Sequence, residues 1–257
     1  MSTEPGDVDL SSFNVKAELN QRFWEGGKLN NEIRLKLMEI ADDFIDYLGV
    51  DFEPVDIIVT GSIANYNWNQ EHSDVDLHIV ANFADISDNT ELIKSFFDDK
   101  RKIWNDEHQG ITIAGFPVEL YVQDAREPHT SSGVYSIEKN KWLVKPSLEK
   151  LSPGEMDDDE VKKRVAMYMN EIDDLADEYE DRVADLDLDD LYEKADELFK
   201  RIKKERKEGF TTGGGEYNNG NIVFKTLRRT GYTKKLLNLR TKAYDQSKSL
   251  FNENNKS

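Results

Sequence analysis

The side chains best suited to chemistry are two aspartates, Asp74 and Asp76, separated by one apolar residue. Alternate residues of a β-strand point to the same face at a rise of about 3.3 Å per residue, so these carboxylates would project side by side. Two like charges on one face repel each other. Magnesium ions about 3.5–4 Å apart can bridge such carboxylates and clamp the oxygens of a phosphoryl transfer. The pair therefore predicts a metal site, and the competing interpretation is two solvated acids on an edge strand.

A third acid, Glu119, alternates with apolar neighbours in a predicted strand and so points away from the core. If that strand lies beside the strand of the two aspartates, three carboxylates converge. Asp124 follows shortly after in the sequence and is the alternative third ligand. We predict Asp74, Asp76 and Glu119 as the catalytic and metal-binding residues.

A Gly61–Ser62 pair ends the β-branched stretch that precedes the aspartates. Glycine allows the chain to turn sharply and the backbone to approach a ligand closely. Exposed amides there, with the Ser62 hydroxyl, could bind a phosphate oxygen. We predict Gly61 and Ser62 as nucleotide-binding residues, with a nucleoside triphosphate as substrate.

The pattern resembles the signature of the DNA polymerase β-like nucleotidyltransferase superfamily, over roughly residues 30–125. The residues that carry the resemblance are Val59-Thr60-Gly61-Ser62, Ser73-Asp74-Val75-Asp76-Leu77 and Glu119. The resemblance implies a small mixed sheet flanked by helices and two divalent ions, Mg²⁺ or Mn²⁺. It also implies transfer of a nucleoside monophosphate from an NTP, such as ATP, with loss of pyrophosphate.

By the same resemblance, the Gly-Ser pair would hold the triphosphate and the two aspartates would bind both metals. Glu119 would bind the catalytic metal and orient or deprotonate the acceptor hydroxyl. That hydroxyl could belong to RNA, a nucleotide, a small molecule or a protein. In the loop after the Gly-Ser pair, Tyr66 and Trp68 could stack a base or cover the core.

The predicted fold class is α+β, with the catalytic domain over residues 30–150. Apolar residues at steps of four and three predict a helix from Asn30, ended by Gly49, and a second helix near 89–107. Short strands are predicted at 55–60, 74–80, 111–113 and 116–122, with a hairpin over 134–144. Residues 1–29 carry little periodic signal and are predicted to be poorly ordered.

Residues 151–257 are predicted to form a helical C-terminal domain. An apolar seam starting at Val161 and a second one at Leu191–Ile202, capped by Asp187, predict an antiparallel helix hairpin with acidic faces. A glycine-rich segment then precedes a last basic helix near 221–251.

The basic helix is predicted to dock its apolar side on the α/β domain. Lys225 and Arg228 are predicted to contact the nucleotide phosphates, and the alternative is that the charges are merely exposed. The segment Asn221–Arg229 is also similar to the tail of predicted nucleotidyltransferases from large bacteriophages. Such an origin would place the protein in the host cytoplasm.

Charge is distributed unevenly along the 257 residues, whose net charge is −18. Residues 201–257 hold 14 Lys/Arg and 5 Asp/Glu, a net of +9, and residues 1–200 hold the other 20 basic and 47 acidic residues, a net of −27. The basic tail could receive phosphates or pair with the acidic body. The absence of cysteine excludes disulfides and thiolate metal sites. Without an export signal or a long apolar run we expect a cytoplasmic protein and no membrane partner.

The sequence therefore favours a metal-dependent nucleotidyltransferase. One alternative is a nucleotide-binding module that has lost turnover and acts in regulation. Another is an interaction protein that uses the acidic hairpin, residues 157–208, as a partner-binding arm.

Overall fold

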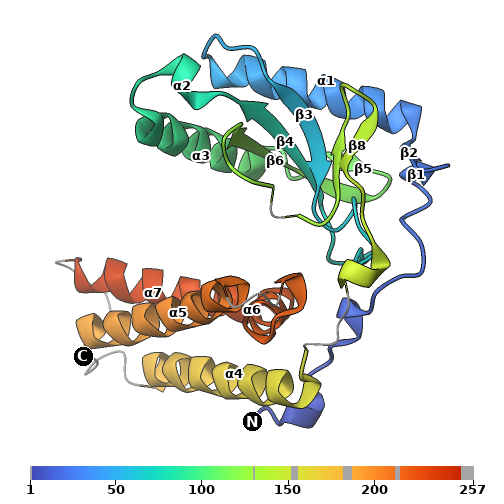
Figure 1. Ribbon diagram of the computed structural model, residues 1–257. Helices are drawn as coiled ribbons and strands as arrows, with labels where there is room; N and C mark the ends of the chain where they lie inside the picture. The colour runs from blue at the N-terminus through green and yellow to red at the C-terminus, as the bar shows by residue number, and fades with distance from the viewer. Residues whose placement is uncertain (1, 130, 152–155, 182–186, 212–214, 250–257) are drawn as a thin grey trace. The chain divides into compact units, whose positions relative to one another are not determined.

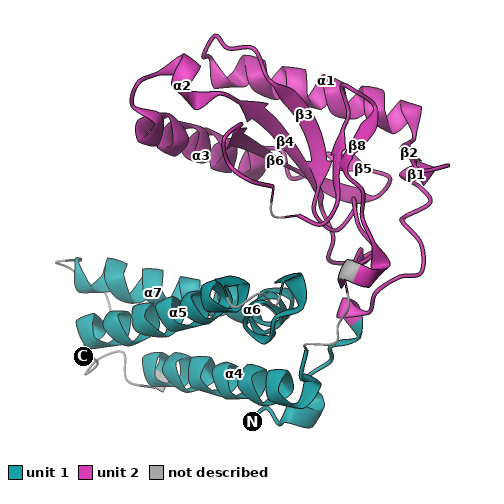
Figure 2. Cartoon of the chain, in the orientation of Figure 1, with its two compact units in different colours: residues 1–11, 152–257 teal, residues 12–151 magenta. Residues whose placement is uncertain are grey.

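The computed structural model describes residues 2–129, 131–151, 156–181, 187–211 and 215–249. The chain divides into two compact units, an α/β unit of residues 12–151 and a helical unit of residues 1–11 and 152–257 (Figure 2). Among the described segments, no helix combines the length and the apolar character that a membrane span requires.

A six-stranded mixed sheet with the strand order β5-β6-β4-β3-β7-β8 forms the centre of the α/β unit (Figure 1). The strands are β3 (Asp56–Thr60), β4 (Val75–Ala81), β5 (Thr112–Ile113), β6 (Phe116–Asp124), β7 (Val134–Ser136) and β8 (Lys141–Val144). β4 and β6 run parallel, and the other neighbouring pairs run antiparallel. The mixed α/β arrangement agrees with the predicted α+β class.

Helices α1 (Asn31–Leu48), α2 (Phe83–Ile86) and α3 (Thr90–Glu107) belong to the same unit. The Asn30 side chain accepts hydrogen bonds from the first free amides of α1, and Gly49 ends that helix in a left-handed conformation with φ 68°. Both long helices were predicted. The apolar side of the sheet packs with them in one core that includes Leu37, Phe44, Val59, Leu77, Ile79, Phe97 and Leu120.

Residues 12–29 differ from the predicted poorly ordered segment. Strands β1 (Trp24–Glu25) and β2 (Lys28–Leu29) pair around a two-glycine turn. Trp24 is buried, donates its indole N–H to the Ile63 carbonyl at 2.8 Å and stacks on Trp142. Two-residue strands leave no periodic pattern in the sequence, so the order comes from aromatic burial against distant residues.

The helical unit contains α4 (Asp158–Asp181), α5 (Leu188–Thr211), α6 (Asn219–Arg229) and α7 (Tyr232–Ser247). The Asp187 side chain accepts hydrogen bonds from the amides of residues 189 and 190, which confirms the predicted cap of α5. The glycines at 213 and 214, part of the predicted glycine-rich segment, lie outside the described residues.

The prediction of a single basic helix near 221–251 is wrong. Helix α6 ends at Arg229 with Thr230 as its C-cap, and Gly231, with φ 84°, is the N-cap of α7. A positive φ is readily adopted only by glycine, so this residue can redirect the chain where a helix would otherwise continue. The end of the predicted range, from residue 250, lies outside the described residues.

The apolar side of α7 packs inside the helical unit, contrary to the predicted docking on the α/β domain. Leu239 and Ala243 are buried against Leu191 of α5. Three basic residues of α7 and its C-cap form ion pairs within the same unit, namely Lys235–Asp173, Arg240–Asp196 and Lys248–Asp189. These three residues of the basic tail therefore pair with acidic residues of α4 and α5.

Candidate metal and nucleotide site

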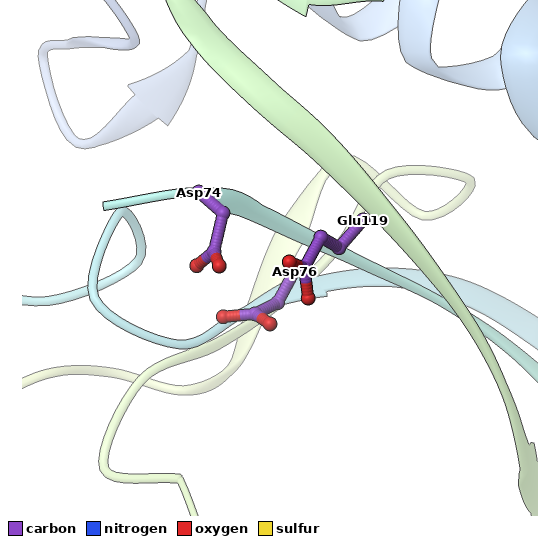
Figure 3. Close-up of side chains that lie close together, drawn as sticks. All are labelled: Asp74, Asp76 and Glu119. Atoms are coloured by element: carbon purple, nitrogen blue, oxygen red, sulfur yellow. The ribbon is translucent and has the colours of Figure 1, made fainter. Parts of the chain in front are cut away.

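Three acids meet on the face of the sheet opposite the core. Asp74 immediately precedes β4, Asp76 lies within it, and Asp76 is the register partner of Glu119 on β6. One oxygen from each of the three half-buried carboxylates lies within 4.8 Å of the others (Figure 3). Val75 and Leu77 point into the core behind them. The convergence expected from the sequence is therefore present.

Asp124, the alternative third acid, lies elsewhere. Its register partner is Ala81, at the far end of β4 from the aspartates. Asp124 is bound by Arg126, with Nη2 2.6 Å from Oδ2, and this hydrogen-bonded cation lowers the pKa of the carboxyl. Odd and even residues of a strand face opposite sides, so Asp124 also lies on the wrong face to join Glu119.

Gly61 lies directly against Asp76. Its φ is 69°, and a Cβ atom built on it would lie 1.7 Å from Oδ2 of Asp76. Thr60, the preceding residue, is the register partner of Asp76 across the antiparallel β3–β4 pair. Only glycine therefore combines this backbone conformation with this approach to the carboxylate.

The loop after Gly61 is organised by serine hydroxyls. Ser62 Oγ lies 2.7 Å from Ser73 Oγ, which also accepts the Asn69 amide at 2.9 Å. Trp68 packs partly buried against the core, and its indole N–H donates to the Glu18 carbonyl at 3.0 Å. Of the two roles considered for Trp68, covering the core is the one these contacts support.

Sequence reasoning missed Tyr121, which binds a member of the acid cluster. Its hydroxyl donates to Oε2 of Glu119 at 2.8 Å. The Arg101 guanidinium lies 4.5 Å from the Tyr121 ring centre, and the His78 ring lies 4.8 Å from it. Burial and the neighbouring Glu119 charge raise the pKa of Tyr121 well above its usual range, so the phenol remains a donor. The available signal was its position two residues after Glu119, on the same face.

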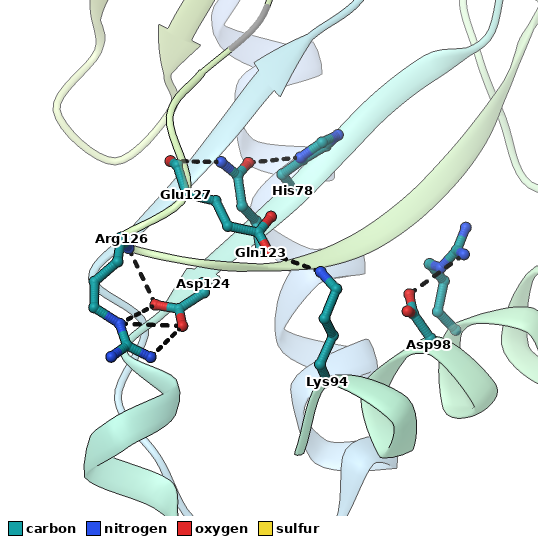
Figure 4. Close-up of polar contacts among 8 residues, drawn as sticks. His78, Lys94, Asp98, Gln123, Asp124, Arg126 and Glu127 are labelled. Atoms are coloured by element: carbon teal, nitrogen blue, oxygen red, sulfur yellow. Dashed lines mark hydrogen bonds and ion pairs between the residues drawn. The ribbon is translucent and has the colours of Figure 1, made fainter. Parts of the chain in front are cut away.

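His78 belongs to a polar network on the same face (Figure 4). Its Nδ1 lies 3.0 Å from Oε1 of Gln123, and Nε2 of Gln123 donates to the Glu127 carbonyl at 3.3 Å. Burial lowers the pKa of His78 to about 4, so the ring is neutral at pH 7. Lys94 closes the network through an ion pair with the Glu127 carboxylate at 2.6 Å.

The donor set of the cluster suits a hard divalent cation. Mg²⁺ prefers carboxylate oxygens at about 2.0–2.1 Å, so two ligands of one ion lie up to about 4.2 Å apart. The observed spread of up to 4.8 Å needs only small side-chain rotations to meet that limit. The Tyr121 hydrogen bond restrains the Glu119 carboxylate through one of its two oxygens.

Lys225 and Arg228 lie on α6 of the helical unit. Lys225 is half-buried, and desolvation lowers its pKa, whereas the nearby Glu216 charge acts in the opposite direction. Arg228 is exposed in the last turn of the helix. Their contact with a nucleotide stays a prediction.

Comparison with known proteins adds little to this geometry. No protein-family model matches the chain, and neither does a curated protein. Among solved structures, a STING-associated CdnE c-di-GMP synthase from Capnocytophaga granulosa is 11% identical, with 85% of this chain and 84% of that chain covered. The TM-score of 0.23 is too low to carry an argument.

Proposed function

We propose that the protein is a metal-dependent nucleotidyltransferase that moves a nucleoside monophosphate from an NTP to a hydroxyl group. The observation that carries the proposal is the convergence of Asp74, Asp76 and Glu119 on neighbouring strands, within 4.8 Å. The Gly-Ser turn against Asp76 and the resemblance of the sequence to polymerase β-like enzymes support the same reaction.

In this reaction the acceptor oxygen bonds to the α-phosphorus of the NTP, the bond from that phosphorus to the β-phosphate oxygen breaks, and pyrophosphate leaves. Bound Mg²⁺ or Mn²⁺ would neutralise the charge that develops on the phosphate oxygens. The three carboxylates would hold the metal, and Glu119 would orient the acceptor hydroxyl and receive its proton. The amides at Gly61 and Ser62 would bind the triphosphate.

The test combines metal binding with turnover. Mn²⁺ titration by electron paramagnetic resonance should show binding to the wild-type protein and its loss in Asp76→Asn. Release of labelled pyrophosphate from each of the four NTPs, with RNA, nucleotides and small hydroxyl compounds as acceptors, should be abolished by the same change. Asp106→Asn is the matched control, because Asp106 is an exposed acid of α3.

The outcomes separate the candidate functions. Mn²⁺ and NTP binding without any pyrophosphate release would indicate a nucleotide-binding module. Absence of metal binding, or equal binding by wild type and Asp76→Asn, would refute the proposed site.

A further inference from the structure

A cavity of about 280 Å³ opens beside the acid cluster, on the same face of the sheet. His78 and Tyr121, which are register partners, form part of its lining. They lie two residues beyond Asp76 and Glu119 on their strands, a step of about 7 Å. A ring-sized molecule in the cavity could therefore extend one hydroxyl to the carboxylates.

The charged groups in the cavity lining are paired. Lys94 lies 2.6 Å from the Glu127 carboxylate, and Asp98 lies 3.5 Å from Arg101 of the same helix. Lys94, the lysine of the lining, is already paired with Glu127, and Asp98 and Glu127 add negative charge, so a phosphate would have to compete with these carboxylates. The lining therefore favours an uncharged ligand over an anionic one.

The hydrogen-bonding groups have fixed directions. The Glu127 carbonyl can only accept, so it must face the amide nitrogen of Gln123, and the amide oxygen must face His78. Nδ1 of His78 then donates to that oxygen, and Nε2 is turned away from Gln123 (Figure 4). His78, Thr60 and Ser131 give the cavity wall polar groups that can hydrogen-bond to a hydroxyl-bearing ligand.

The size of the cavity limits the ligand. Pockets for drug-sized molecules have volumes of about 300–1,000 Å³. A volume of about 280 Å³ accommodates a molecule the size of a monosaccharide or a nucleoside.

We infer that this cavity binds the acceptor of the transfer, and that the acceptor is an uncharged, hydroxyl-bearing ring compound of that size. The role of this ligand as the acceptor rests on the proposed function, but its binding in the cavity can be tested without metal or turnover.

The binding experiment uses the full chain in EDTA. Saturation-transfer NMR is recorded with adenosine, guanosine, cytidine and uridine in one arm, and with glucose, galactose and myo-inositol in the other. Wild type should bind at least one probe, and binding should weaken at least tenfold in both Gln123→Leu and His78→Phe. Gln21→Leu, at an exposed position of the same unit, should bind as wild type does.

His78→Phe retains an aromatic ring against Tyr121, so it keeps the test valid if Gln123→Leu does not fold. Circular dichroism checks the folding of both variants. Failure of every probe to bind wild type would overturn the inference. Binding by both variants as tight as that of wild type would also overturn it, as would displacement of the probe by inorganic phosphate. With a probe that binds and is turned over, the KM for that acceptor should rise at least tenfold in both variants and the KM for the NTP should remain unchanged. Absence of Mn²⁺ binding by wild type would refute the proposed function but not the ligand site, because probe binding is measured without metal.

Discussion

Gly61 and Asp76 illustrate how single residues define the candidate site. A side chain at position 61 and the Asp76 carboxylate would occupy the same space. The glycine thus serves two needs, a left-handed backbone and room for a metal ligand. The second need is invisible in the sequence, where the two residues are separated by the whole loop.

Gly61→Ala should displace the Asp76 carboxylate and reduce turnover by about 100-fold, because misplacement of a reacting group by about 1 Å has that effect. Gly26→Ala is the control, since Gly26 also has a positive φ, 57°, but nothing lies within 4 Å of the added Cβ. Both variants should lose roughly 1–2 kcal/mol of stability from backbone strain. Thermal unfolding and pyrophosphate release measure the two effects, and equal turnover of the variants would contradict the explanation.

Tyr121 acts on the cluster through Glu119. Tyr121→Phe removes the hydroxyl that donates to Oε2 and keeps the ring contacts with Arg101 and His78. Mn²⁺ affinity should fall by roughly 10–100-fold, the usual effect of removing a partner that orients a metal ligand. Isothermal titration calorimetry would show this change, and an unaltered affinity together with an unaltered KM for metal would exclude a positioning role.

At the scale of elements, the parallel pairing of β4 and β6 decides which acids meet. A parallel pair needs a crossover, here provided by α3 and β5, and this connection leaves Glu119 beside Asp76. The same crossover places Lys94 and Asp98 of α3 in the lining of the cavity and Arg101 against the Tyr121 ring. One connection therefore builds both the acid cluster and its neighbouring cavity.

The end of β6 is stabilised by the Asp124–Arg126 pair, with a consequence for acid stability. The pKa of Asp124 is lower in the folded protein than its usual value of about 3.9. The pair therefore stabilises the fold above that value, and its contribution disappears as the pH falls through the lower, folded-state pKa. Urea unfolding should find Asp124→Asn less stable than wild type at pH 7, with the difference shrinking at pH 3. A difference that stays constant with pH would show that the charge is irrelevant; Asp106→Asn is again the control.

At the scale of the molecule, the two units have separate apolar clusters. All three acids and the cavity belong to the α/β unit, whereas Lys225 and Arg228 belong to the helical unit. Metal binding and any phosphate contact by the basic helices are therefore properties of different units and can be altered separately.

Leu236→Ala tests this separation. Leu236 of α7 is fully buried, and truncation of a buried leucine destabilises a fold by about 2–5 kcal/mol. Calorimetry should show a lower unfolding temperature, whereas Mn²⁺ affinity measured well below that temperature should match wild type. A parallel loss of Mn²⁺ binding in the folded variant would show that the metal site depends on the helical unit.

The sequence by itself determined the short-range features of this protein. Strand alternation is enough to put Asp74 and Asp76 on one face, and the apolar spacing and caps define α1, α3 and the start of α5. These features depend on residues a few positions apart, so local periodicity records them. The break at Gly231 was missed because both flanking segments share one amphipathic, basic character.

Only the tertiary structure decided the features that depend on distant partners. The choice of Glu119 over Asp124 follows from the register of β6 against β4, and the order of the N-terminal segment follows from Trp24 packing on Trp142. The packing of α7 and the cavity beside Tyr121 likewise depend on contacts across the chain. Such contacts arise from burial and hydrogen bonding between surfaces that no local pattern encodes.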